Sequence, residues 1–166
     1  IDSLSNYYVD TKKLEKLTLS KNLETIGKSA FVYAQSLKEL VIPDSVISIE
    51  EGAFANGSLQ KLQLSSSLET IGPRAFTYLQ IEELTIPASV KTIGDKVFAF
   101  SFTALKSVVY LGTTPDDITS KGTGIFEGCN NLTTLIVPNA PETTSEDLKS
   151  KWQNFLGGNF TDVRKE

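Results

Sequence analysis

This chain lacks the residues on which most metal centres and nucleophilic sites depend. Its 166 residues include no histidine, no methionine and a single cysteine, Cys129. Histidine-based triads, Cys–His pairs and zinc ligand sets are therefore excluded within this sequence. One cysteine also excludes an internal disulfide. We expect no enzymatic activity, no cofactor and no metal, with a buried and unreactive thiol at Cys129.

Clustered positive charge and long apolar runs are also missing. The 16 basic residues are outnumbered by 20 acidic ones, for a formal net charge of −4. Nucleic acid and anionic membrane surfaces both require clustered Lys and Arg, so we expect neither as a partner. No apolar run approaches the ~20 residues of a membrane span. The chain begins at Ile1 without a signal-peptide pattern, so we interpret it as a chain from which a targeting segment has been removed.

What the sequence has instead is a repeat. The pattern Leu-x-x-Leu-x-Leu/Ile, then Val/Leu-x-x-Ile, then Ala-Phe begins at Leu14, Leu37, Leu59 and Ile81, in steps of 23, 22 and 22 residues. The first part of each unit alternates as a strand does. A fixed period of this kind predicts an α/β repeat solenoid of about six units with short parallel strands. The leucines and isoleucines of the repeat, up to Leu135, are all expected to be buried.

The two ends of the chain depart from this pattern. Tyr8 precedes Leu14 by the spacing at which Phe31 precedes Leu37, so residues 1–13 are predicted to be a degenerate half-repeat or an N-terminal cap. Residues 14–144 form the solenoid itself. Residues 145–166 are predicted to form a C-terminal cap, made of a helix and a tail.

The predicted cap helix has an apolar stripe at helical spacing. Leu148, Trp152, Phe155 and Leu156 follow an i, i+4, i+7, i+8 pattern, and Ser145 is a suitable N-cap. Gly157 and Gly158 are expected to end the helix. Earlier in the chain, a glycine directly follows the isoleucine of several units, where we predict a tight turn with positive φ. These glycines are Gly27, Gly72 and Gly94, with Glu50 in the same column of the second unit.

The units resemble a known family. Residues 37–54 read LKELVIPDSVISIEEGAF, which resembles the BspA-like leucine-rich repeat of bacterial surface proteins, as do residues 81–98. The stretched fifth unit and the segment 135–138 are similar to the family's usual C-terminal unit. The resemblance covers roughly residues 14–140. The family often has a cysteine three residues after the phenylalanine, and Cys129 alone matches.

The resemblance implies a function as well as a leucine-rich repeat array. It implies a secreted or surface-anchored bacterial protein that binds host or matrix proteins, for example in adhesion, without enzymatic activity. It carries over no ligand residues, because the family shares a scaffold motif and not a site motif. Two alternatives stay open, namely a carbohydrate-binding surface module and a purely structural spacer.

The outward strand positions supply the first candidate site. In one column of outward positions, the charges alternate in sign over the first four units, and Ser107 and Thr134 replace them in the last two. The neighbouring column becomes apolar toward the C-terminal end, where a long loop over residues 112–124 follows. Rigid scaffolds flanked by longer loops favour binding sites. Two alternatives involve no binding. In one, the charged column is a solvated ladder, and in the other, the loop covers the apolar pair Val109 and Ile136. The candidate residues are Ser107, Val109, Thr134, Ile136, Asp116 and Asp117. The charge column is Lys16, Glu39, Lys61, Glu83, Ser107 and Thr134, and its neighbour is Thr18, Val41, Gln63, Thr85, Val109 and Ile136.

A second candidate is a row two residues beyond each repeat phenylalanine. It contains Tyr33, Asn56, Tyr78, Phe100 and Gly128. Exposed aromatic side chains on this row would bind protein or sugar, whereas buried ones would pack between units. Tyr33, Tyr78 and Phe100 are therefore the second choice for a partner-binding site.

Overall fold

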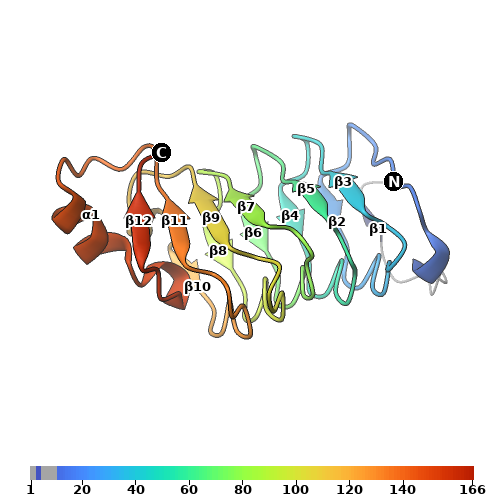
Figure 1. Ribbon diagram of the computed structural model, residues 1–166. Helices are drawn as coiled ribbons and strands as arrows, with labels where there is room; N and C mark the ends of the chain where they lie inside the picture. Colours follow the sequence, from blue (N-terminus) through green and yellow to red (C-terminus); the bar gives the residue numbers. More distant parts are fainter. Residues whose placement is uncertain (1–2, 5–10) are drawn as a thin grey trace.

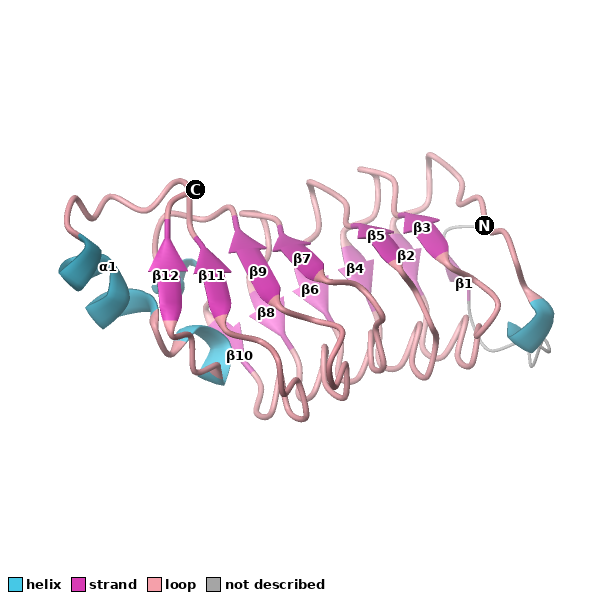
Figure 2. Ribbon diagram, viewed as in Figure 1, coloured by secondary structure: helices cyan, strands magenta, loops and turns pink. Residues whose placement is uncertain are grey.

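The chain folds into an elongated array of coils that ends at one helix. The structure is a computed structural model that describes residues 3–4 and 11–166. Two rows of short strands run along the array, and turns connect them at the lower edge in Figure 1. The helix α1 (Ser145–Trp152) lies beside the last strand (Figure 2). This arrangement confirms the predicted solenoid of parallel strands with a C-terminal helix.

The rear strands pair in chain order, and every pair is parallel. Each strand from β2 to β8 places a Ser or Thr outward and an isoleucine inward, because successive side chains of a strand point to opposite faces. The inward isoleucines are buried and in register, as between Ile49 and Ile71. The rear strands are β1 (Ser3–Leu4), β2 (Thr25–Ile26), β4 (Ser48–Ile49), β6 (Thr70–Ile71), β8 (Thr92–Ile93) and β10 (Ser120–Lys121).

The front strands form two separate groups. The pair β3–β5 is one sheet, and β7, β9, β11 and β12 form another. Residues 14–20 form no strand, so the first unit lacks the front strand expected around Leu17 and Leu19. The strand β3 is therefore an edge of the front face. The front strands are β3 (Glu39–Val41), β5 (Lys61–Gln63), β7 (Glu83–Ile86), β9 (Ser107–Tyr110), β11 (Thr134–Ile136) and β12 (Asp162–Arg164).

The phenylalanines that close the units stack along the array. Ring centroids of Phe31 and Phe54 lie 5.1 Å apart, and those of Phe54 and Phe76 lie 5.4 Å apart. Phe76 and Phe98 continue the row at 6.1 Å, and Phe126 follows Phe98 at 6.0 Å. Offset stacking of this kind adds to the stabilisation that area burial provides. Each ring therefore ties one coil to the next.

The glycines that follow the repeat isoleucines serve a purpose other than the one predicted. Gly27, Gly72 and Gly94 do not have positive φ, so that prediction was wrong. A Cβ added to Gly72 would lie 2.6 Å from the Glu50 carbonyl carbon, and one added to Gly94 would lie 2.5 Å from the Pro73 nitrogen. Gly72 and Gly94 are glycine because adjacent coils approach each other there with their backbones. The positive φ values occur two residues later, as at Gly52 and Arg74.

Burial of the repeat leucines and isoleucines is extensive but not complete. Most have relative exposures below 9%, as predicted. Leu14, Leu17 and Leu132 are half-buried, and each lies in a coil near one end of the array. Leu62 is also half-buried. It lies on β5, beside the interruption between β5 and β7, where the front strands no longer pair. Two other residues between Leu14 and Leu135, Ile47 and Leu111, are exposed.

The difference between Leu62 and Ile71 gives a test of this register. Replacing Ile71, which is fully buried, with alanine should lower the free energy of unfolding by ~2–5 kcal/mol, because apolar contacts are lost and a cavity remains. Leu62→Ala should cost clearly less, since its side chain is already partly in water. Urea titration of both variants measures the two losses. Equal losses, or a larger loss at Leu62, would contradict the register.

The cap helix is shorter than predicted and begins one residue earlier. Its N-cap is Thr144, whose hydroxyl accepts a hydrogen bond from the Asp147 amide at 3.1 Å, so Ser145 is the first helical residue. The helix ends at Trp152. Phe155 and Leu156 belong to a separate 3-10 turn, η3 (Phe155–Gly157), in which Leu156 has φ +52°. The predicted stripe is nevertheless buried, because this turn folds its two residues back against the core.

The tail beyond the helix adds a strand that the repeat pattern did not predict. The strand β12 pairs in parallel with β11, and Thr134 lies opposite Asp162. Phe160 meets Phe126 edge to face at 6.1 Å and closes the phenylalanine row. At the other end, the described residues include β1 and a 3-10 turn, η1 (Thr11–Lys13). Tyr8, on which the predicted half-repeat depends, lies outside the described residues.

Candidate functional site

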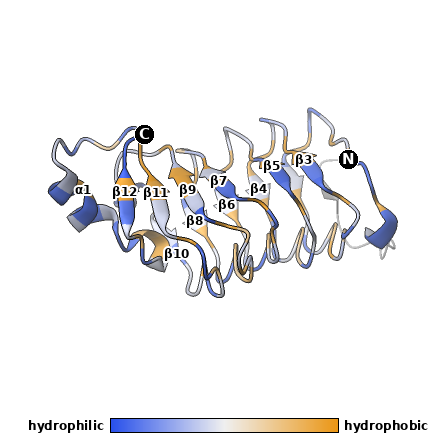
Figure 3. Cartoon of the chain, viewed as in Figure 1, coloured by the Kyte–Doolittle hydropathy of each residue, from blue (hydrophilic) through white to orange (hydrophobic). Residues whose placement is uncertain are grey.

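Four of the predicted site residues lie together on the front strands. Ser107 is opposite Thr134, and Val109 is opposite Ile136, on the paired strands β9 and β11. All four side chains are half-buried. The strands β3 and β5 are coloured hydrophilic and β9 hydrophobic in Figure 3, as the apolar column predicts. Val109 and Ile136 retain accessible surface, so the loop over residues 112–124 does not hide them.

The most exposed apolar residue of the apolar column lies at the other end of the front face. Val41 is 60% exposed, whereas Val109 and Ile136 are half-buried. The reason is the number of neighbouring strands. Val109 lies between Thr85 and Ile136 on paired strands, whereas Val41 lies on the edge strand β3 with a paired strand on one side only. The column thus becomes more apolar toward its C-terminal end but less exposed.

The charged column pairs only in part. The Nζ atom of Lys61 lies 2.6 Å from Oε1 of Glu39, as alternating charges on neighbouring strands predict. Among the described residues, no ion pair links Lys61 to Glu83, because the front strands β5 and β7 do not pair with each other. Beyond it the column is linked by hydroxyl groups. Ser107 donates to Glu83 at 3.1 Å, and Thr134 donates to Asp162 at 3.5 Å.

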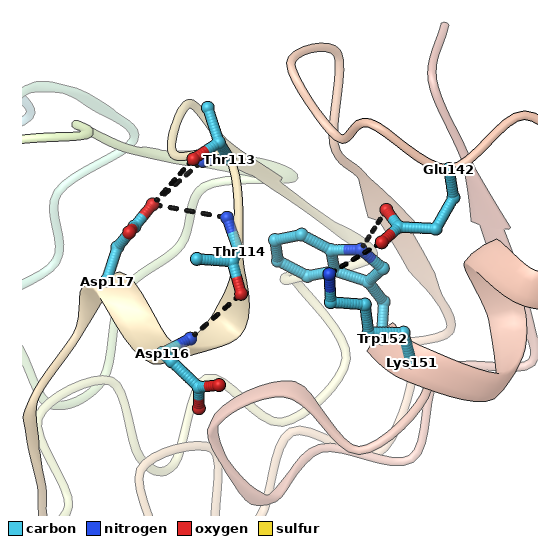
Figure 4. Close-up of polar contacts among 7 residues, drawn as sticks. All are labelled: Thr113, Thr114, Asp116, Asp117, Glu142, Lys151 and Trp152. Atoms are coloured by element: carbon cyan, nitrogen blue, oxygen red, sulfur yellow. Dashed lines mark hydrogen bonds and ion pairs between the residues drawn. The ribbon is translucent and has the colours of Figure 1, made fainter.

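Asp116 and Asp117 do not join these four residues. They lie on the 3-10 turn η2 (Pro115–Asp117), which leads from the front strand β9 to the rear strand β10. The Asp117 carboxylate accepts hydrogen bonds from the Thr113 and Thr114 amides at 2.9 and 3.1 Å (Figure 4). The hydrogen bond from the Thr113 amide is the main cause that lowers the pKa of Asp117. Its carboxylate is therefore a capping group.

Asp116 is exposed, and its carboxylate lies 3.9 Å from Nζ of Lys121. Among residues 3–4 and 11–166, no cluster of three or more His, Cys, Asp or Glu side chains is placed to hold a metal ion. The half-buried Cys129 has a thiol whose pKa is raised by burial, and it donates to the Phe98 carbonyl oxygen at 3.3 Å. A thiol with a raised pKa is a poor nucleophile.

The second candidate row lies on the turns that lead from the rear strands to the front strands. Every residue of the row has positive φ, between +58° at Asn56 and +73° at Gly128. Tyr33 is 48% exposed, Tyr78 is 37% exposed, and Phe100 is half-buried. Positive φ costs a residue with a Cβ roughly 1–2 kcal/mol. Tyrosine and phenylalanine thus occupy a column to which Gly128 and Asn56 are better suited.

One exposed aromatic residue of this region escaped the sequence analysis. Phe102 is 48% exposed and lies beside Tyr78 and Phe100, with ring centroids 6.0 and 6.4 Å away. Tyr78 and Phe100 are themselves stacked at 5.5 Å. The signal was an altered spacing, because Leu105 comes seven positions after Phe98, whereas Leu59 comes five positions after Phe54. The longer segment places a third ring on the surface.

The comparison with protein-family models agrees with this architecture. The model of the BspA type leucine rich repeat region matches this chain in 6 copies, over residues 2–133 and 100–151. A leucine-rich repeat protein from Bacteroides ovatus is similar in structure, with 19% sequence identity and a TM-score of 0.44. The match covers 74% of this chain and 43% of that protein. A search of curated proteins found no match.

The family match agrees with the strand pattern described above. The family is associated with bacterial surface proteins and is typically non-enzymatic. A search of the described residues for a helix long and apolar enough to cross a membrane found none. The repeat units, the stacked parallel strands and the family match together lead to one conclusion. The chain belongs to the BspA-type leucine-rich repeat family.

Proposed function

We propose that this chain is a non-enzymatic scaffold that binds protein partners at a bacterial cell surface, in adhesion to host or matrix proteins. The family's association with bacterial surface proteins supports the location. Stacked repeats with a continuous core present a rigid, extended surface, which is what such scaffolds use for binding. The site is proposed on β9 and β11.

The observation that carries this proposal is the pair Val109 and Ile136. The two side chains lie opposite each other on β9 and β11, the two inner strands of their sheet, and keep accessible surface. Hydroxyl groups of Ser107 and Thr134 lie in the next column of the same strands. Protein interfaces combine an apolar centre depleted of charge with a polar rim. The pair and its neighbours have this composition on a small scale.

Replacing Val109 with lysine should abolish binding at this site. The new ammonium group would lie in the apolar centre and would have to lose its hydration when the partner docks. Its aliphatic part can extend along the surface, so the fold should persist. We expect affinity for a bound extracellular-matrix protein to fall at least about tenfold. Biolayer interferometry against a panel of immobilised matrix proteins measures this.

Val41→Lys is the matched control, because Val41 lies in the same column on β3 and is more exposed. This variant should keep binding if the site is on β9 and β11. Binding that persists at full strength in Val109→Lys would place the site elsewhere. A wild-type chain that binds no protein of the panel would favour the structural-spacer alternative.

A further inference from the structure

The turns at the lower edge of the array carry a surface feature separate from the front strands. We call it the aromatic ridge and define it by Tyr33, Tyr78, Phe100 and Phe102. Three of its rings are in mutual contact, with centroids 5.5, 6.0 and 6.4 Å apart, and Tyr33 lies two coils away in the same column. Tyr33, Tyr78 and Phe102 are exposed.

Contacts among Tyr78, Phe100 and Phe102 add some stability, but they do not account for the choice of aromatic residues at these positions. All four residues have positive φ, from +35° at Phe102 to +66° at Tyr78, a conformation that side chains with a Cβ disfavour. The same column has Asn56 and Gly128 in other coils, so the coil itself does not need an aromatic residue there. Exposed rings also leave apolar area in water. A binding role explains why strained, exposed positions are aromatic.

The ridge is also uncharged. The turn segments along this edge, residues 30–37, 52–60, 75–81, 97–105 and 128–133, include no Asp, Glu, Lys or Arg, although charged residues make up 22% of the chain. Their polar side chains are amides and hydroxyls. The amides are Gln35, Asn56, Gln60, Gln80, Asn130 and Asn131.

Charged groups lie along the flanks of this strip and, at its N-terminal end, on η1. Lys96 lies over the Phe100 ring, with Nζ 5.9 Å from the centroid, and is paired with Glu127 at 2.9 Å. On the other flank, Lys38 donates to the Gln35 carbonyl oxygen at 2.8 Å. Both lysines thus already have partners within the chain. The strip between them offers aromatic faces and neutral hydrogen-bonding groups.

We infer that the aromatic ridge binds a neutral polysaccharide chain that runs along the array. The apolar faces of sugar rings stack on aromatic side chains, and amide groups hydrogen-bond to sugar hydroxyls. An uncharged strip suits an uncharged ligand, since it offers no counterion to an acidic one. Tyr33 and Tyr78 are two coils apart, or about 10 Å at the usual strand spacing. That separation suits stacking on alternate sugars of an extended chain.

A protein partner fits the ridge less well. Protein-binding hot spots are enriched in arginine and tryptophan besides tyrosine, and charged rims direct protein association. The ridge contains neither arginine nor tryptophan. The inference does not depend on the protein-binding site proposed on β9 and β11, because the two surfaces share no residue.

Affinity electrophoresis tests the inference with the intact chain. Native gels cast with soluble hydroxyethylcellulose, xyloglucan, dextran or galactomannan serve as the neutral probes, and a gel without polysaccharide is the reference. We expect at least one probe to retard the wild-type chain. Raising the salt to ~1 M, where the Debye length is ~3 Å, should leave the association constant within about twofold.

The decisive variant is Tyr78→Asn combined with Phe102→Asn. Asparagine tolerates positive φ, and Asn56 shows that the column accepts it, so this variant should fold. Its association constant should fall by about tenfold or more. Ile47→Asn is the matched control, since Ile47 is an exposed apolar residue on the rear side of the array, away from the ridge. Unchanged near-ultraviolet circular dichroism of the buried Trp152 confirms that each variant is folded.

Three results would overturn the inference. One is a wild-type chain that none of the four polysaccharides retards. Another is retardation that the double variant keeps at full strength. The third is a wild-type chain that binds no polysaccharide but self-associates or binds a protein, together with a double variant that has lost this association. That result would assign the ridge to a second copy of this chain or to another protein.

Discussion

Replacing Trp152 with alanine is expected to lower the free energy of unfolding by ~3–5 kcal/mol, one of the largest single losses in this chain. Trp152 is fully buried and is the last residue of α1. Its ring lies 5.9 Å from that of Tyr110 and 5.6 Å from that of Phe155, and Tyr110 and Phe155 are 4.7 Å apart. Removing the indole would leave a cavity between the cap and the last coils.

The Trp152→Ala substitution would also remove a hydrogen bond. The indole Nε1–H donates to Oε2 of Glu142 at 3.1 Å, and Lys151 holds the other carboxylate oxygen at 2.6 Å (Figure 4). Burial, with a further contribution from Asp117, raises the pKa of the neighbouring Tyr110 hydroxyl to about 12. The Tyr110 hydroxyl is uncharged at neutral pH and, within the described part of the chain, has no hydrogen-bond partner, so this part of the core depends on packing.

Urea titration followed by circular dichroism measures the effect. Trp152→Phe is the control, because it keeps an aromatic ring in the cluster and loses the hydrogen bond to Glu142. We expect the free energy of unfolding of Trp152→Phe to lie between those of the wild type and Trp152→Ala. A loss below ~1 kcal/mol for Trp152→Ala, within the range of ordinary substitutions, would contradict the proposed role of the cap.

Replacing Gly94 with alanine is expected to destabilise the chain by about 3 kcal/mol, although a single methyl group is added. The new Cβ would lie 2.5 Å from the nitrogen and 2.9 Å from the Cα of Pro73 in the preceding coil. Neither atom can move without shifting the backbone of that coil. Neighbouring coils would therefore separate locally, and the hydrogen bond from the Gly94 amide to the Ile71 carbonyl, now 2.8 Å long, would weaken.

Thermal and urea unfolding of Gly94→Ala measure this loss. Glu50→Ala is the matched control, because Glu50 occupies the same column and already carries a Cβ. That control loses the hydrogen bond that the exposed Glu50 carboxylate accepts from the Lys28 amide at 2.8 Å, so it should cost about 1 kcal/mol, still clearly less than Gly94→Ala. If Gly94→Ala were as stable as the control, the coils would not be in the close contact described here.

The repeat and its main consequences follow from the sequence by itself. Leucine and isoleucine at a fixed period can be buried only by stacking one unit on the next, so the parallel strands and the solenoid were predictable. The phenylalanine row was predictable for the same reason, because Phe54 and Phe76 recur at the same place in each coil. The register that sets Val109 opposite Ile136 came from counting along the repeat. Local pattern is sufficient for these features.

Tertiary structure decided what depends on neighbours in space. Val41 is the most exposed apolar residue of its column because residues 14–20 form no strand beside it. Gly94 is glycine because another coil's backbone lies against it, which no local turn pattern reveals. Asp117 became a capping group once η2 had formed, and the tail gained a strand through pairing with β11. Phe102 joined Tyr78 through an altered turn. Exposure and close approach are properties of the assembled coils, whereas periodicity is a property of the sequence.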